Sequence, residues 1–242
     1  MERRTVIISY EWVRVPPLAS LLDINNNKMM NNLLLERSKL FAKYAENMPV
    51  KSDKLELQLD YPDSGWIDMH FRVNDEEKIM ITASDVYEPF EDIRDWLEQI
   101  VKHIFDFTPT GVRIYDEFDD YLLYYEPFFF HSDELLTNEP PQLDGLFYIY
   151  DSCEKKIVSD AVCETKTFVR SLYESILTFA KESSKREEFV DDWIVGAYNH
   201  EYGQFDDDDP RVKDIFINKV TSSTVEAFID NKDSAIRFIP IK

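Results

Sequence analysis

The regular alternation of apolar and polar side chains between residues 55 and 86 is the feature that most constrains the fold. In the first segment, 55–61, every second residue is a leucine or a tyrosine, and acidic or amide side chains lie between them. The same period of two recurs over 65–73 and 78–86, with turn-forming sequences between the segments. Because successive side chains point to opposite faces of a strand, this pattern predicts three half-buried strands joined as an antiparallel meander.

A helical period replaces the alternation directly after the meander. Apolar side chains recur every three or four residues over 89–106, which predicts an amphipathic helix with acidic side chains on its outer face. Four more strands and a second long helix are expected over 111–118, 121–130, 143–151, 155–162 and 164–182. Strands followed by a helix therefore occur twice, without a repeat at the level of residues.

Both ends of the chain favour further elements. A strand over 5–15 and a helix over 28–47 precede the meander, and a last strand is expected over 235–241. The apolar residues of the 28–47 helix lie near one side: Met30, Leu33, Leu34, Phe41 and Tyr44. Before that strand, three helices are expected, over 184–203, 209–220 and 222–230. In the last of these helices, Ser223 is the expected N-cap, and Glu226 three residues later would complete a capping box.

These patterns together predict an α+β protein. The expected fold is an antiparallel sheet in two meander-like groups of strands, packed with helices, with a helical C-terminal part. We expect one globular domain over 1–242, because this length is enough to bury a sizeable core. Within it, residues 1–54, a strand and a helix, either form an N-terminal subdomain or pack directly on an acidic α+β body over 55–242.

The net charge of −21 is spread unevenly along the chain. Residues 1–54 hold nine basic and six acidic side chains and residues 55–242 hold 18 and 42, so the two parts carry +3 and −24. Such a field repels nucleic-acid phosphates and anionic membranes and speeds encounter with cationic partners. We therefore expect no direct nucleic-acid or membrane binding, and a basic protein is the favoured partner. Solubility alone would be a sufficient reason for the charge.

The two cysteines, Cys153 and Cys163, are too few for a disulfide framework, which favours a cytoplasmic location. Because a helix is expected to begin at Cys163, its thiolate could be stabilised there, although a small buried hydrophobe is the commoner role. No nucleophile elbow, phosphate-binding loop or dinucleotide fingerprint occurs. His200 and Glu201 begin a zinc-protease pattern, but Gln204 stands where the second histidine is needed. We expect no catalytic residue, metal site or cofactor.

Four consecutive aspartates, Asp206–Asp209, run directly into Pro210. Asp209 is the expected N-cap of the following helix, with the proline at its first position, where a missing amide costs nothing. A calcium loop of the EF-hand type would alternate its ligands and include a glycine, and neither feature is present. The cluster therefore has a local structural explanation.

The candidate partner-binding residues are acidic or aromatic and come from a turn, a strand and a helix: Asp116, Glu117, Asp119, Asp120, Tyr121, Tyr124, Glu91 and Asp95. Tyrosines beside carboxylates would suit a cationic protein surface. Each group also has a structural alternative. The acids over 116–120 suit a hairpin turn, those of the 89–106 helix a solvated face, and the apolar run over 121–130 a strand buried on both faces.

The expected function is non-enzymatic binding of a basic protein, in the manner of an inhibitor, an immunity protein or a regulatory factor. The alternative is a carboxylate-based hydrolase, with or without a metal ion, whose acids would come from residues 116–120 or Asp206–Asp209. A structural subunit is a third possibility, which oligomeric state would address.

Overall fold

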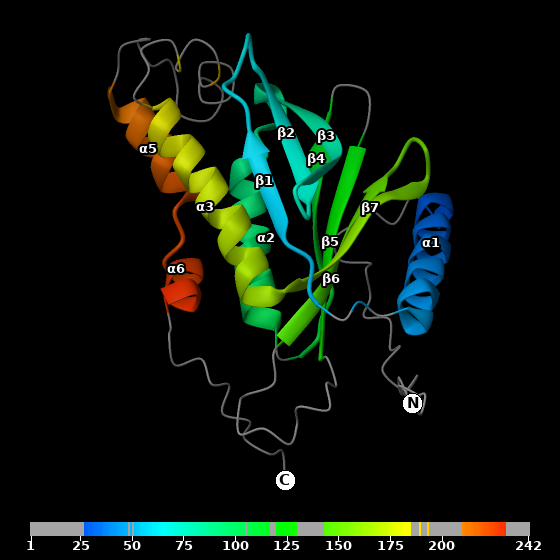
Figure 1. Ribbon diagram of the computed structural model, residues 1–242. Coiled ribbons are helices and arrows are strands. Elements are labelled where there is room, and N and C mark those ends of the chain that lie inside the picture. The colour runs from blue at the N-terminus through cyan, green and yellow to red at the C-terminus, as the bar shows by residue number, and fades with distance from the viewer. Residues whose placement is uncertain are drawn as a thin grey trace.

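The computed structural model describes residues 27–47, 49, 51–104, 106–116, 120–129, 143–184, 189, 193 and 210–230. Two antiparallel sheets are packed with helices, which confirms the expected α+β class with helices in the C-terminal part (Figure 1). The elements are α1 (Asn27–Glu46), β1 (Leu55–Leu59), β2 (Trp66–Val73), β3 (Glu76–Ser84), the 3₁₀ helix η3 (Asp85–Tyr87), α2 (Phe90–His103), β4 (Thr110–Tyr115), β5 (Asp120–Phe129), β6 (Leu143–Asp151), β7 (Lys156–Glu164), α3 (Thr165–Ser183), α5 (Pro210–Val220) and α6 (Ser223–Asp230).

The first sheet has the strand order β1-β2-β3, as the alternating pattern predicts. Leu55 pairs with Val73 across β1 and β2, and the leucines of β1 lie on the buried face. Only Asn74 and Asp75 separate β2 from β3, and both have positive φ, 53° and 66°. A two-residue hairpin loop of this kind matches the twist of its strands, and asparagine and aspartate tolerate the left-handed conformation well.

The second sheet has the order β4-β5-β6-β7, and its two central strands are covered on both faces. In β5, Leu123 and Tyr125 face the main core with the first sheet, whereas Leu122 and Tyr124 face a second core beneath α1. Every residue of β6 is buried. The apolar run over 121–130 was interpreted as a strand buried on both faces, and this is correct for residues 122–125 of β5.

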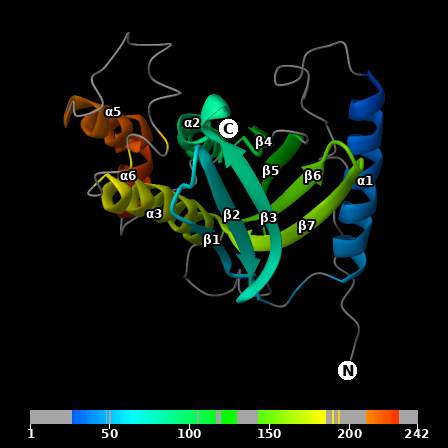
Figure 2. The same ribbon diagram turned by 90° about the horizontal axis from the view of Figure 1, so that it is seen from above.

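The main core lies between the two sheets, α2 and α3. Phe71 of β2 and Phe147 of β6 stack with ring centroids 6.1 Å apart, so the inner faces of the two sheets meet. The predicted apolar stripe of α2 is buried, and Trp96 Nε1 donates to Thr110 Oγ1 at 3.1 Å. Helices α2, α3, α5 and α6 lie on one side of the molecule, and α1 lies on the opposite side, against β6 and β7 (Figure 2).

A close backbone approach sets where α3 begins. An ideal Cβ on Gly145 would lie 2.2 Å from the ring of Tyr125, so only glycine leaves room for that ring. The Tyr125 hydroxyl donates to Thr165 Oγ1 at 2.7 Å, and Thr165 Oγ1 donates to Leu143 O at 2.9 Å. The first residue of α3 is thereby bonded to both central strands of the second sheet.

Helix α1 forms at the expected place, but its buried side differs from the expected one in one residue. Leu33 and Leu40 enter the second core, whereas Phe41 is 38% exposed. The expectation that Phe41 faces the core is wrong, because the sheet face meets the side of the helix on which Leu40 lies. Lys43 Nζ also pairs with Asp160 Oδ2 of β7 at 2.6 Å.

Helix α6 is capped one residue earlier than expected. Ser222 Oγ accepts a hydrogen bond from Val225 N at 3.2 Å and donates one to Glu98 Oε1 of α2 at 2.7 Å. The N-cap is therefore Ser222 and not Ser223. The carboxylate of Glu226 accepts from the Tyr173 hydroxyl at 3.0 Å. Contacts with two other helices thus decide where this helix begins.

Several expected elements lie outside the described residues. These are the strand over 5–15, nearly all of the helix over 184–203, the Asp206–Asp209 cap and the strand over 235–241. Within the described parts, no helix combines the length and apolar composition needed to cross a bilayer.

Candidate functional site

The described acidic residues proposed for partner binding lie in two places, at the junction of β4 and β5 and on α2. Glu117 and Asp119 lie outside the described residues. Asp116 directly follows β4, and the carboxylate of Asp120, which begins β5, lies 3.9 Å from Arg113 Nη1. These positions fit the hairpin alternative.

On α2, Arg94 partly neutralises both proposed carboxylates. Its Nη2 lies 3.1 Å from Glu91 Oε1 and 2.6 Å from Asp95 Oδ1. Glu91 also lies 3.4 Å from Lys219 Nζ of α5. The acidic face of α2 is therefore weaker as a cation-binding surface than its sequence suggests.

The two proposed tyrosines are turned toward the interior. Tyr124 is 2% exposed and stacks on Tyr148 at 5.2 Å, and burial raises the pKa of its hydroxyl above the ordinary value. Tyr121 is half-buried against the main core. Among the described aromatic residues, Tyr87 is 54% exposed, and its ring lies 5.2 Å from that of Tyr115. Sequence reasoning missed Tyr87, which lies in the short turn before α2.

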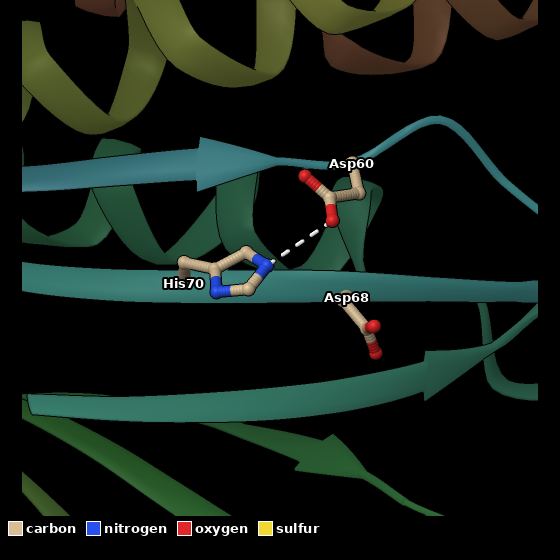
Figure 3. Close-up of side chains that lie close together, drawn as sticks. All are labelled: Asp60, Asp68 and His70. Carbon is tan, nitrogen blue, oxygen red and sulfur yellow. Dashed lines mark hydrogen bonds and ion pairs between the residues drawn. The ribbon is translucent and has the colours of Figure 1, made fainter. Parts of the chain in front are cut away.

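A different concentration of carboxylates lies on the outer face of the first sheet. Its strands place apolar side chains inward, so alternate polar ones point out, among them Glu56 and Asp60 from the β1 side and Asp68 and His70 from β2. Figure 3 shows Asp60 and His70 directed toward each other, with Asp68 beside them. With Glu77 of β3, this face carries four carboxylates, alongside His70 and Arg72.

His70 lies between two carboxylates on this face. Its Nδ1 is 2.8 Å from Glu77 Oε2, and its Nε2 is 3.3 Å from Asp60 Oδ2. Burial alone would lower the pKa of His70, but the hydrogen bonds to Glu77 and Asp60 outweigh it and raise the pKa above the ordinary 6.5. The network therefore favours a protonated, bridging imidazole.

The same residues offer a set of donors that could hold a metal ion. One potential ligand atom from each of Asp60, Asp68 and His70 lies within 4.8 Å of the others. Imidazole and carboxylate together suit zinc or manganese, and Glu77 occupies the position of an outer partner to the histidine. Sequence reasoning did not single out this group. The spacing Asp68-x-His70 was visible, but the position of Asp60 opposite Asp68 depends on strand register.

Two hollows flank β1. One, of about 420 Å³, is lined by three carboxylates together with Tyr61, Trp66 and two hydroxyl residues; its carboxylates are Asp60, Asp63 and Asp68. The other is a groove of about 560 Å³ between β1 and α3, whose described lining includes the carboxylates Glu56, Glu174 and Glu182 and the basic residue Arg72. Tyr61 lines both. We call the lining of these two hollows the β1 surface.

Cys163 belongs to β7, and its side chain is buried. Burial raises the pKa of its thiol above the ordinary value. The N-cap of α3 is Glu164, whose carboxylate accepts from Lys166 N and Thr167 N at 3.1 and 2.7 Å. The stabilised-thiolate alternative is therefore wrong, and the buried-hydrophobe alternative is correct.

Comparison of the chain with protein-family models, with curated proteins and with solved structures finds no match of any kind.

Proposed function

We propose that the protein is a non-enzymatic binding protein for a basic protein partner, acting as an inhibitor, immunity protein or regulator, and that the β1 surface is its contact. One observation supports this most strongly. Three carboxylates line each of the hollows beside β1, and Arg72 is the one Lys or Arg side chain among the described residues of their linings.

The charge of these two linings favours a basic partner. Lysine and arginine side chains of a partner would meet carboxylates that lie partly within concave surfaces, where field lines concentrate. Complementary charge of this kind mainly raises the association rate and excludes acidic competitors. The net charge of −24 over residues 55–242, which includes these carboxylates, adds long-range attraction of a basic partner.

Site-specific photocrosslinking tests the proposal. A photoreactive residue at exposed Gln58 of β1 should capture a protein that the same residue at Leu35, exposed on α1 at the opposite side, does not. The captured protein is then identified, purified and titrated with this chain. We expect it to be basic, with a Kd that rises at least tenfold between about 50 and 300 mM salt. Equal capture from both positions, or a salt-independent Kd, would contradict the proposal.

Charge reversal gives a second readout with a matched control. Glu174→Lys on α3 should weaken binding of the purified partner severalfold, mainly by slowing association. Glu46→Lys makes the same change at the exposed end of α1, away from the β1 surface, and should alter binding much less. If both variants weaken partner binding equally, binding depends on the net charge of the protein and not on the β1 surface.

A carboxylate-based, metal-dependent hydrolase is the second candidate, and the Asp60–Asp68–His70 group favours it. Cobalt titration separates the two. A ligated Co²⁺ would give visible absorption bands that His70→Gln abolishes, and an accompanying zinc- or manganese-dependent cleavage of a generic phosphoester would favour the hydrolase. Absence of both signals would leave the binding protein as the better explanation.

A further inference from the structure

Among the described residues, one edge of β1 has no strand partner, and this free edge opens onto the groove. In the strand order, β1 is an edge strand with β2 as its neighbour. Asp60 N donates to Asp68 O at 3.0 Å and Asn74 N donates to Lys54 O at 2.9 Å, which fixes the residues of even number as those that bond β2. Because hydrogen-bonded pairs alternate along an antiparallel ladder, Leu57 and Leu59 direct their amides and carbonyls toward the other edge.

Helix α3 runs beside that edge (Figure 1), and a groove remains between the helix and the strand. Ser171 Oγ donates to Leu55 O at 2.7 Å and so covers only the start of the strand. Farther along α3, Ser175 and Thr178 face the groove, and both are small. Ser175 Oγ donates to Ser171 O of its own helix at 2.8 Å. The groove of about 560 Å³ thus remains beside Leu57 and Leu59.

Several of the usual protections against strand addition are missing from β1. Exposed edges are commonly guarded by proline, by lysine or by a bulge, and the sequence of β1, LELQL, has neither residue. The register between β1 and β2 is also continuous. Nearby, Arg72 Nε is buried and lacks an acceptor among the described residues, so an occupant that brings carbonyl oxygens would meet a donor in the groove.

We infer that a basic partner inserts an extended segment into this groove and pairs it with the free edge of β1. The inference rests on the proposed function and specifies its mode. A paired strand shares faces with β1, so residues opposite Leu57 would point inward, toward the small hydroxyl side chains of α3. Residues opposite Glu56 and Gln58 would point outward, where cations would meet the carboxylates of Glu56 and Glu174. The fitting segment therefore alternates lysine or arginine with small apolar residues.

N-methylated peptides test the pairing. The probe is a seven-residue acetylated and amidated peptide that alternates lysine with valine. With the peptide antiparallel to β1, valine amides would donate to the Leu57 and Leu59 carbonyls, whereas lysine amides would point away from β1. Methylating the valine amides should therefore weaken binding at least about tenfold relative to methylating the lysine amides, at identical charge and composition, as measured by fluorescence anisotropy.

Groove-filling variants give an independent readout. Ser175→Trp should weaken binding of the unmethylated peptide at least about tenfold, whereas Ala42→Trp, at an exposed position of α1, should not change it. Circular dichroism of both variants checks that each remains folded.

The outcomes separate this inference from the proposed function. If both methylated peptides bind equally and only charge matters, edge pairing is wrong while the acidic contact surface stands. If no peptide binds but a basic protein is captured from Gln58, the mode is again wrong and the function stands. If neither binds, both fail. Self-association that blocks the groove, detected by native mass spectrometry and not displaced by peptide, would make a second copy the occupant and overturn the inference.

Discussion

Arg37 of α1 donates two hydrogen bonds to Glu126 of β5, from Nε to Oε1 at 2.6 Å and from Nη2 to Oε2 at 2.5 Å. The Tyr148 hydroxyl donates to the same carboxylate at 2.7 Å. The two charged side chains are only 14% and 6% exposed. A fork of this kind, shielded from water, fixes the helix in one position on the sheet.

Removal of Arg37 should therefore destabilise the protein strongly. Arg37→Ala leaves the Glu126 carboxylate buried with no positive partner, which costs about 3–5 kcal/mol of the free energy of unfolding. The double variant Arg37→Met with Glu126→Gln removes both charges and should recover much of that loss. Urea denaturation of the three proteins measures the difference. A single variant within about 0.5 kcal/mol of wild type would contradict the ion pair.

Glu88 should make stability fall as pH rises from about 5 to 8. Burial is the main cause that raises its pKa from 4.5 to about 7, although its carboxylate accepts from Phe90 N at 2.7 Å. A raised carboxyl pKa means that the folded state binds more protons than the unfolded state between these values. The charged form thus costs up to about 3 kcal/mol above pH 7.

Glu88→Gln keeps the acceptor for Phe90 N and removes the charge, so its stability should vary much less over that pH range. Glu174→Gln, on the exposed side of α3, is the matched control and should keep the wild-type profile. Thermal unfolding at a series of pH values is the measurement. A Glu88→Gln profile parallel to wild type would show that Glu88 is ionised without cost.

His70 should titrate above its ordinary pKa of 6.5, because Glu77 and Asp60 stabilise its charged form. NMR titration of the imidazole measures this directly. The Asp60→Asn, Glu77→Gln double variant should lower the pKa, whereas Asp95→Asn on α2 should leave it unchanged. A group with a raised folded pKa stabilises the fold below the unfolded pKa and loses that contribution as pH rises through the folded pKa. A wild-type value at or below 6.5 would contradict the network.

Two adjacent serines offer a sharp test of the helix cap. Ser222→Ala removes both the acceptor for Val225 N and the donor to Glu98, so it should lower the free energy of unfolding by about 1–2 kcal/mol. Ser223→Ala changes the first helical residue and should cost less than about 0.5 kcal/mol. Equal effects in denaturant unfolding would mean that the cap is not confined to Ser222.

The periodicity of the sequence was enough to predict most of the described strands and helices. Leu55, Leu57 and Leu59 can occupy one face of a strand only if their polar neighbours occupy the other, so local pattern and tertiary burial agree. The choice between Ser222 and Ser223 could not be made in this way. Both fit the local cap pattern, and the hydrogen bond to Glu98, 124 residues away, decides between them.

The candidate site was harder to predict for the same reason. The acids over 116–120 form a visible cluster because they are adjacent in sequence. Glu56, Asp60 and Asp68, in contrast, have the pattern of ordinary solvent-facing residues on two strands. Their convergence requires the register that pairs Gln58 with His70 and the approach of α3 to β1. Tyr124 was proposed as a partner-binding residue, but its ring is buried in the second core. The sequence does not reveal this, because the burial depends on the position of α1.

The lack of a side chain at Gly145 has consequences beyond β6. It admits the Tyr125 ring, which holds Thr165 and so determines the point from which α3 departs beside β1. Any larger residue there would push the ring aside and shift the start of the helix, which would alter the width of the groove between β1 and α3. A residue at the centre of the second sheet, remote from the groove, thus helps to determine the shape of that groove.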